Sequence, residues 1–119
     1  MTRRVLLAVP DLFFLTRIQS TAALAGIAVE PVELAALVER CAAQPPDLVV
    51  IDLHAVGDPL ERARELKRHP ATRHVPILGF YSHVDTAMRE QAAEAGIERV
   101  LPRSAFSARL AQWLAAPRE

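Results

Sequence analysis

The chain has 119 residues, which is enough for one domain with a full core and too few for two ordinary ones, so we predict a single domain over residues 1–119. Lys and Arg balance Asp and Glu at 14 each, and this gives no basic surface for nucleic acid or membrane lipids, neither of which we expect as a partner. The N-terminal apolar run is interrupted by Pro10 and Asp11, and no stretch is long enough to span a membrane. We therefore expect a cytoplasmic protein.

Five short apolar runs follow one another along the chain, and a segment with helical periodicity comes after each. The runs do not alternate with polar residues, which is typical of strands buried on both faces of a parallel sheet. Five strands in alternation with helices predict an α/β fold with a doubly wound parallel sheet. The predicted strands are residues 5–9, 26–30, 47–52, 75–81 and 99–102.

In such a sheet, ligands and reactive groups lie outside the carboxyl ends of the strands. The residues that follow the first strand are Pro10 and Asp11, and those that follow the third begin at Asp52. Residues 82–85 follow the fourth strand, and Arg103 with Ser104 follows the fifth. We expect any chemistry to come from these positions.

The stretch PDLVVIDL, which ends the third strand on Asp52, resembles the third strand of bacterial response-regulator receiver domains. The stretches VPILGFYS and EAGIERVLPRS extend the resemblance over nearly the whole chain. The resemblance implies a five-stranded sheet of order 2-1-3-4-5 and places Asp52 at the position of the family's phosphoacceptor. PDLFFLTRI, SHVDT and LPRSAF are further similar to small stand-alone receiver-like proteins.

The chain departs from the receiver pattern around Asp52. Receivers hold Mg²⁺ with a pair of acids after the first strand, whereas Val9 and Pro10 stand here and only Asp11 is acidic. A hydroxyl after strand four and a lysine after strand five then engage the phosphoryl oxygens in receivers. The hydroxyl position aligns with Tyr81, and Arg103 replaces the lysine. We describe the altered rim by seven residues: Val9, Pro10, Asp11, His54, Tyr81, Ser82 and Arg103.

These departures favour a pseudo-receiver, which keeps the fold, is no enzyme, needs no cofactor and acts through contacts with other proteins. Mg²⁺ supplies much of the electrostatic stabilisation in phosphoryl transfer. We therefore expect that the ordinary Mg²⁺-dependent phosphorylation of Asp52 is lost. One alternative is a two-component response regulator that is phosphorylated on Asp52 in a phosphorelay, with Mg²⁺ as cofactor. Another is a sensor of a small ligand or metal at this rim, with four weak candidate ligands: Asp11, Asp52, His54 and His83.

A carboxylate at the end of a buried strand needs a partner, and for Asp52 we predict either the backbone N–H groups of its own loop or Arg103. Phe13 and Phe14 lie about 100° apart around the first helix. We expect either one ring in the core and the other at the surface, where it would contact a partner, or both rings partly buried in the core. Trp113 belongs to the apolar stripe of the last helix. That stripe could also serve a homodimer through the face of helix 4, strand 5 and helix 5.

Overall fold

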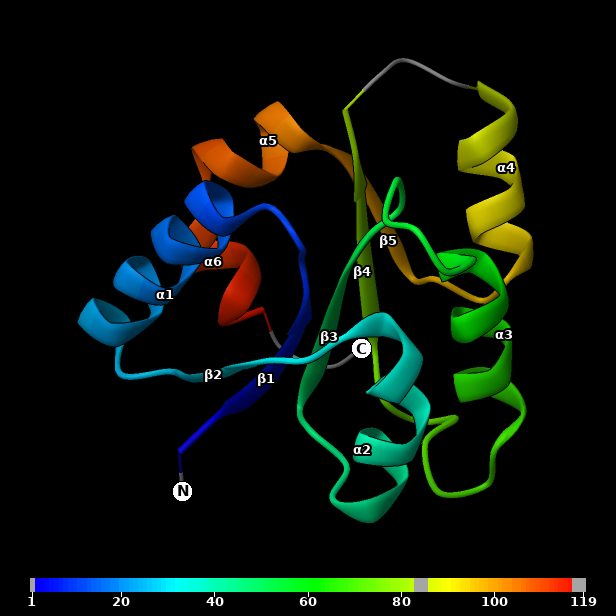
Figure 1. Ribbon diagram of the computed structural model, residues 1–119. Coiled ribbons are helices and arrows are strands. Elements are labelled where there is room, and N and C mark those ends of the chain that lie inside the picture. Colours follow the sequence, from blue (N-terminus) through cyan, green and yellow to red (C-terminus); the bar gives the residue numbers. More distant parts are fainter. Residues whose placement is uncertain (1, 83–85, 117–119) are drawn as a thin grey trace.

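A sheet of five parallel strands in the order β2-β1-β3-β4-β5 forms the centre of the computed structural model (Figure 1). The structure describes residues 2–82 and 86–116. The strands are β1 (Arg4–Ala8), β2 (Ala28–Pro31), β3 (Leu48–Asp52), β4 (Ile77–Tyr81) and β5 (Arg99–Pro102). The predicted fold class and strand order are therefore confirmed.

The helices alternate with the strands and cover both faces of the sheet. They are α1 (Leu12–Ala25), the 3₁₀ turn η1 (Leu34–Ala36), α2 (Leu37–Ala43), α3 (Pro59–Arg68), α4 (Thr86–Glu94), α5 (Arg103–Ala108) and α6 (Leu110–Leu114). Helices α1, α5 and α6 lie on one side of the sheet, and α2, α3 and α4 lie on the other (Figure 1). In the described part of the chain, no helix is both long and apolar enough to cross a membrane.

Two separate cores result from the alternation of side chains along each strand. On β1, Leu6 and Ala8 point to the core under α2, α3 and α4, whereas Val5 and Leu7 point to the core under α1, α5 and α6. The three central strands are buried along their whole length apart from Arg4 at the start of β1. This double burial explains why the central strands read as continuous apolar runs.

The core under α1 is built around three phenylalanines. Phe14 meets Phe80 edge to face, in a T-shaped arrangement with ring centroids 5.2 Å apart, and it meets Phe106 in the same way at 5.8 Å. Phe80 and Phe106 stack at 5.4 Å. Because these rings come from α1, β4 and α5, they tie the start of α1 to the start of α5 near the carboxyl ends of the strands.

The C-terminal helix differs from the prediction of one continuous helix after the fifth strand. It is split into α5 and α6 at Arg109, whose φ of −136° lies outside the helical range. Phe106 on the first segment and Leu110 and Leu114 on the second are all buried against the sheet. The break therefore lets two short segments present their apolar side chains to one core.

Candidate functional site

Asp52 ends β3 and is almost completely buried, with 9% of its surface exposed. Its Oδ1 accepts a hydrogen bond of 2.9 Å from the backbone N–H of His54, two residues along the same loop. The Asp52 carbonyl accepts a further bond from the N–H of Ala55. The first of the two predicted partners, the loop backbone, is thus the one present in the structure.

Asp11 is the N-cap of α1, and both of its carboxylate oxygens are used. Oδ1 accepts hydrogen bonds from the N–H groups of Phe13 at 3.0 Å and Phe14 at 3.2 Å, as expected for a capping aspartate. Oδ2 accepts a bond of 2.8 Å from a terminal nitrogen of Arg103. The Arg103 hydrogen bond, followed by that from Phe14, holds the pKa of the Asp11 carboxyl below its usual value.

Arg103 begins α5, and the predicted ion pair between Arg103 and Asp52 is wrong. The guanidinium pairs with Asp11 instead, and its central carbon lies 4.2 Å from the ring centroid of Phe14. The helices α1 and α5 cover the same face of the sheet, so their first residues meet, whereas Asp52 belongs to a different loop. Arg103 is therefore held on two sides, by a carboxylate and by an aromatic face.

Four further rim residues at the ends of β1 and β4 differ in their exposure to water. Val9 is buried after β1 and Pro10 is exposed. Tyr81 is buried as the last residue of β4, and Ser82, the next residue, is exposed. The side-chain hydroxyl at the predicted switching position thus belongs to a core tyrosine.

No group of three or more His, Cys, Asp or Glu side chains suited to a metal ion occurs in residues 2–82 and 86–116. Of the weak metal candidates, Asp11 is occupied by the helix cap and Arg103, and Asp52 bonds to its own loop. His54 is exposed on that loop. His83 lies outside the described residues.

The two adjacent phenylalanines have opposite environments, which is the first of the two arrangements expected from the sequence. Phe13 is 91% exposed and Phe14 is 4% exposed. Phe13 is therefore available at the surface near the strand ends, and Phe14 belongs to the aromatic core.

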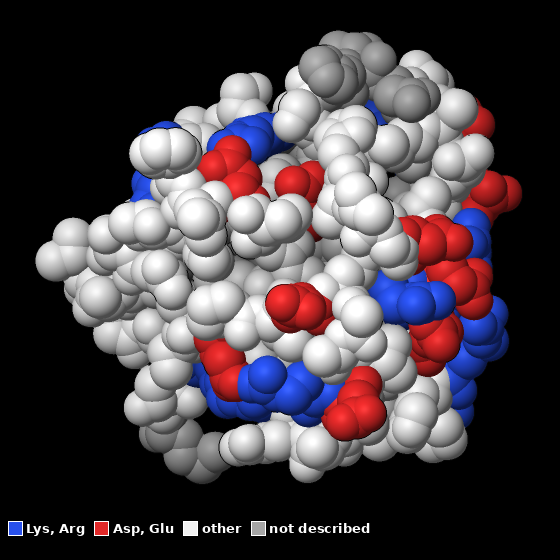
Figure 2. Space-filling view, viewed as in Figure 1, with Lys and Arg blue, Asp and Glu red and all other residues white. Residues whose placement is uncertain are grey.

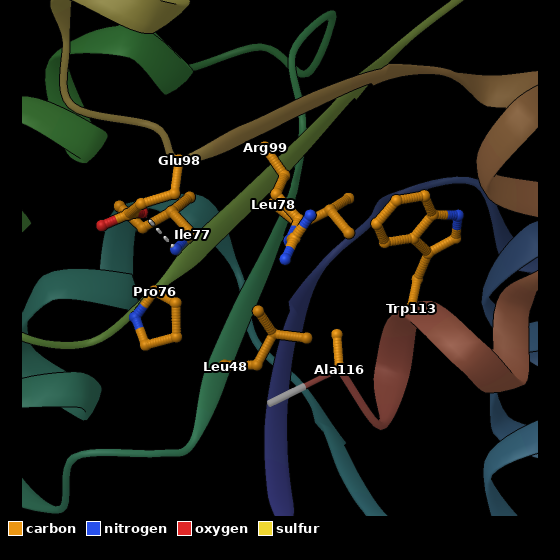
Figure 3. A pocket seen from close by; sticks show the side chains of 8 residues that line it. All are labelled: Leu48, Pro76, Ile77, Leu78, Glu98, Arg99, Trp113 and Ala116. Carbon is orange, nitrogen blue, oxygen red and sulfur yellow. Dashed lines mark hydrogen bonds between the residues drawn. The ribbon is translucent and has the colours of Figure 1, made fainter. Parts of the chain in front are cut away.

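Trp113 lies far from this rim, at the opposite end of the sheet. It contributes to a pocket of about 250 Å³ at the amino ends of β3, β4 and β5 (Figure 3). The guanidinium carbon of Arg99 lies 5.3 Å from its ring centroid, and the indole Nε1 is buried without a hydrogen-bond partner among the described residues. The homodimer face predicted around this helix stays a prediction.

A larger hollow of about 700 Å³ lies beside the rim and was not found by reasoning from the sequence. It is lined by the segments after β1, β2 and β3 and by the first turns of α3. The available signal was the apolar residues at the ends of the strands and in the loops that follow them, among them Pro31 and Val56.

Solved protein structures share this fold. A putative response regulator from Chloroflexus aurantiacus J-10-fl superposes with a TM-score of 0.83 at 18% identity, covering 96% of this chain and 98% of that one. The chain has the fold of response-regulator receiver domains.

Two further receiver-fold structures agree over almost the full length. A LuxR-family two-component response regulator from Aurantimonas sp. SI85-9A1 has a TM-score of 0.79 at 25% identity, covering 99% of this chain and 89% of that one. The receiver domain of a sensor histidine kinase from Pseudomonas aeruginosa PAO1, which holds a magnesium ion in its active-site cleft, has a TM-score of 0.80 at 23% identity, with 98% and 100% covered. No protein-family model and no curated protein matches the sequence.

Proposed function

We propose that this chain is a pseudo-receiver of two-component signalling, which acts through contacts with other proteins and not through Mg²⁺-dependent phosphorylation of Asp52. The ion pair between Arg103 and Asp11 is the observation that carries this proposal. It joins the position of the receiver lysine to the one acid that follows β1, and so uses both groups in a single structural contact.

Phosphoryl transfer to a carboxylate depends on cations that neutralise the charge on the transferred group. Arg103 stands at the position of the receiver lysine, and it is held 2.8 Å from Asp11 and over the ring of Phe14. A phosphoryl group on Asp52 would compete with Asp11 for this guanidinium. The geometry thus favours a site in which Arg103 stays paired with Asp11.

Magnesium is bound in proteins with near-octahedral oxygen geometry, usually by one or two carboxylates with waters. In the histidine kinase receiver from Pseudomonas aeruginosa a magnesium ion occupies the active-site cleft. In the present chain, Asp11 has donors on both oxygens, so Asp52 is, among the described rim residues, the carboxylate with an oxygen that accepts no hydrogen bond from them. A single carboxylate supports weak Mg²⁺ binding at most.

Protein partners suit such a module because the strand-end rim carries an exposed aromatic side chain. Phe13 is 91% exposed, and aromatic residues are enriched among the side chains that dominate binding energy at interfaces. We include a homodimer through α4, β5 and the C-terminal segments α5 and α6 in this proposal, since Trp113 on α6 is only partly buried. We assign no catalytic activity to the chain.

The proposal is tested by titrating the ¹⁵N-labelled protein with Mg²⁺ and then with beryllofluoride, a mimic of the phosphoryl group, and following backbone amide resonances. We expect no saturable change at Asp52, His54, Tyr81 or Arg103 at millimolar Mg²⁺. The Asp52→Asn variant is the matched control. Saturable shifts at these positions that are absent in the control would support the phosphorylated regulator instead.

A further inference from the structure

The hollow of about 700 Å³ is an open groove at the carboxyl ends of β1, β2 and β3, which shares Val9 and Pro10 with the receiver rim but is not lined by Asp11, Asp52 or Arg103. Most of its lining is apolar, and its walls include Pro10, Leu12, Pro31, Val32, Leu34 and Val56. Its volume falls within the range of about 300–1,000 Å³ that is usual for sites of small organic ligands.

The groove lies where the sheet changes its direction of winding. β1 is flanked by β2 on one side and by β3 on the other, and the helices α1 and α2 cover opposite faces (Figure 1). In open parallel sheets, the crevice outside the carboxyl ends of the strands at such a switch point is the usual place for a bound ligand. The position of the groove is therefore independent support for a binding site.

The rim of the groove exposes large apolar side chains to water. Four large hydrophobic side chains in the described residues are highly exposed, and two of them, Leu12 and Val56, line the groove at 73% and 97% exposed. They come from two different elements, α1 and the loop after β3. An apolar molecule between them would remove apolar surface from water on both sides, which is favourable.

The charges of the lining define the class of ligand. Glu33 and Arg62 are the two charged side chains of the lining, so its charges cancel. Arg62 Nε lies 2.6 Å from Glu65 Oε1, so an anionic ligand would have to share this guanidinium with a carboxylate. Glu33 is exposed, so water screens its charge and weakens its attraction for a cationic ligand. An ionic ligand would bring a charge without a counterion into an apolar groove, which is unfavourable.

Arg62 also supplies hydrogen-bond donors. Its terminal nitrogens make no hydrogen bond with the residues described. A guanidinium group can only donate, so these N–H groups match an oxygen acceptor on a ligand. Figure 2 shows the molecule from the same side as Figure 1. Charges of both signs gather around α2 and α3 on this side, and the surface over α1 is mostly uncharged.

We propose that this groove binds an uncharged, mainly apolar small molecule that carries a hydrogen-bond acceptor. Gly57 lines the groove at a φ of 115°, a conformation that other residues rarely adopt, so this wall of the groove carries no side chain there. The inference does not depend on whether Asp52 is phosphorylated. A ligand at this position would lie beside the loops that follow β1 and β3, and so beside the surface offered to a partner.

The test compares three probes of equal chain length, 1-octanol, octanoate and octylammonium, by titration of the full ¹⁵N-labelled chain. We expect 1-octanol to bind saturably and to shift the amide resonances of Val32, Leu34 and Gly57. The two charged probes should bind at least roughly fivefold more weakly. Absence of saturable 1-octanol binding, tighter binding of a charged probe, or shifts confined to the pocket beside Trp113 would overturn the proposal.

Two exposed positions provide matched variants that leave the core intact. Val56→Asp places a charge on the wall of the groove, and we expect it to raise the Kd of 1-octanol roughly tenfold. Leu24→Asp changes a side chain that is 92% exposed at the far end of α1 and is the control, with unchanged binding. An equal effect of both variants would overturn the assignment. So would a dimer that Val56→Asp dissociates while 1-octanol does not bind, because a second copy would then be the occupant.

Discussion

Arg103 and Asp11 connect the loop after β5 with the loop after β1 through an ion pair of 2.8 Å, although these strands are not neighbours in the sheet. The contact is possible because α1 and α5 begin next to each other on one face, where Phe14 and Phe106 also meet. The Asp52 carboxylate instead accepts a hydrogen bond from the backbone N–H of His54. Arg103 thus makes an ion pair with Asp11, whereas in a phosphoryl-binding arrangement it would face a group on Asp52.

The pair predicts a pH-dependent loss of stability that Asp11→Asn should remove. The pKa of Asp11 is lowered in the folded chain, chiefly by the Arg103 hydrogen bond, whereas an unfolded aspartate has a pKa of about 3.9. The stabilisation is therefore fully present above about pH 4 and is lost as pH falls through the folded pKa. Because asparagine also caps helices well, the variant removes mainly the charge pair.

Urea unfolding of wild type and Asp11→Asn from pH 7 to pH 2 measures this effect. The difference in unfolding free energy should be largest at neutral pH and shrink in acid. Arg103→Gln should lower stability in the same pH range, with Arg73→Ala as the control, since the Arg73 side chain is exposed and makes no ion pair among the described residues. A difference that stays constant with pH would show that the ion pair does not stabilise the fold.

Asp52→Asn is expected to change the unfolding free energy by no more than about 1 kcal/mol, because the substituted amide oxygen can accept the same bond from His54. Asp52 has no cationic partner to lose among the described residues. Chemical denaturation with both proteins at one pH is sufficient. A loss of roughly 3 kcal/mol or more would indicate a broken buried ion pair, and so would restore Arg103 as the partner of Asp52.

Phe14→Ala should destabilise the chain by about 3–5 kcal/mol, because it removes a buried ring that packs on Phe80 and Phe106 and carries Arg103 on its face. Phe13→Ala is a matched control one residue away, and its effect should stay within about 0.5 kcal/mol. Thermal unfolding of the two variants side by side gives the comparison. Similar losses in both would contradict the placement of the two rings.

Cys41 should not react with a thiol reagent such as 5,5′-dithiobis(2-nitrobenzoate) in the folded protein at pH 8. Burial raises the pKa of its thiol to about 11, and the thiolate is the reactive form. Its contribution to stability is present below the unfolded pKa of about 8.5 and is lost as pH rises toward the folded value. Full reaction is expected in urea, whereas rapid labelling without denaturant would mean that α2 opens readily.

Much of the fold could be predicted because its strands are recognisable in the sequence. Burial on both faces makes β3 and β4 continuous apolar runs, and the regular alternation with helical segments leaves few topologies. The strand order itself came from the resemblance to receivers. The break at Arg109 could not be predicted, because residues 103–114 keep a helical spacing of apolar residues across it.

The partners within the site were harder to predict than its members. The sequence placed Asp11, Asp52 and Arg103 at one end of the sheet, but two carboxylates were then available to one guanidinium. The decision depends on how α1 and α5 pack around Phe14, which is a tertiary contact without a local signal. The groove was missed for a related reason, since its walls come from three loops that are distant in sequence.

The central claim is that Asp52 does not accept a phosphoryl group by the Mg²⁺-dependent route. Incubation of the full chain with acetyl phosphate and Mg²⁺, followed by intact-mass measurement beside Asp52→Asn, tests it most directly. The closed contact between Arg103 and Asp11 predicts that both proteins keep their unmodified mass. A Mg²⁺-dependent gain of one phosphoryl group in the wild type, absent from Asp52→Asn, would contradict it.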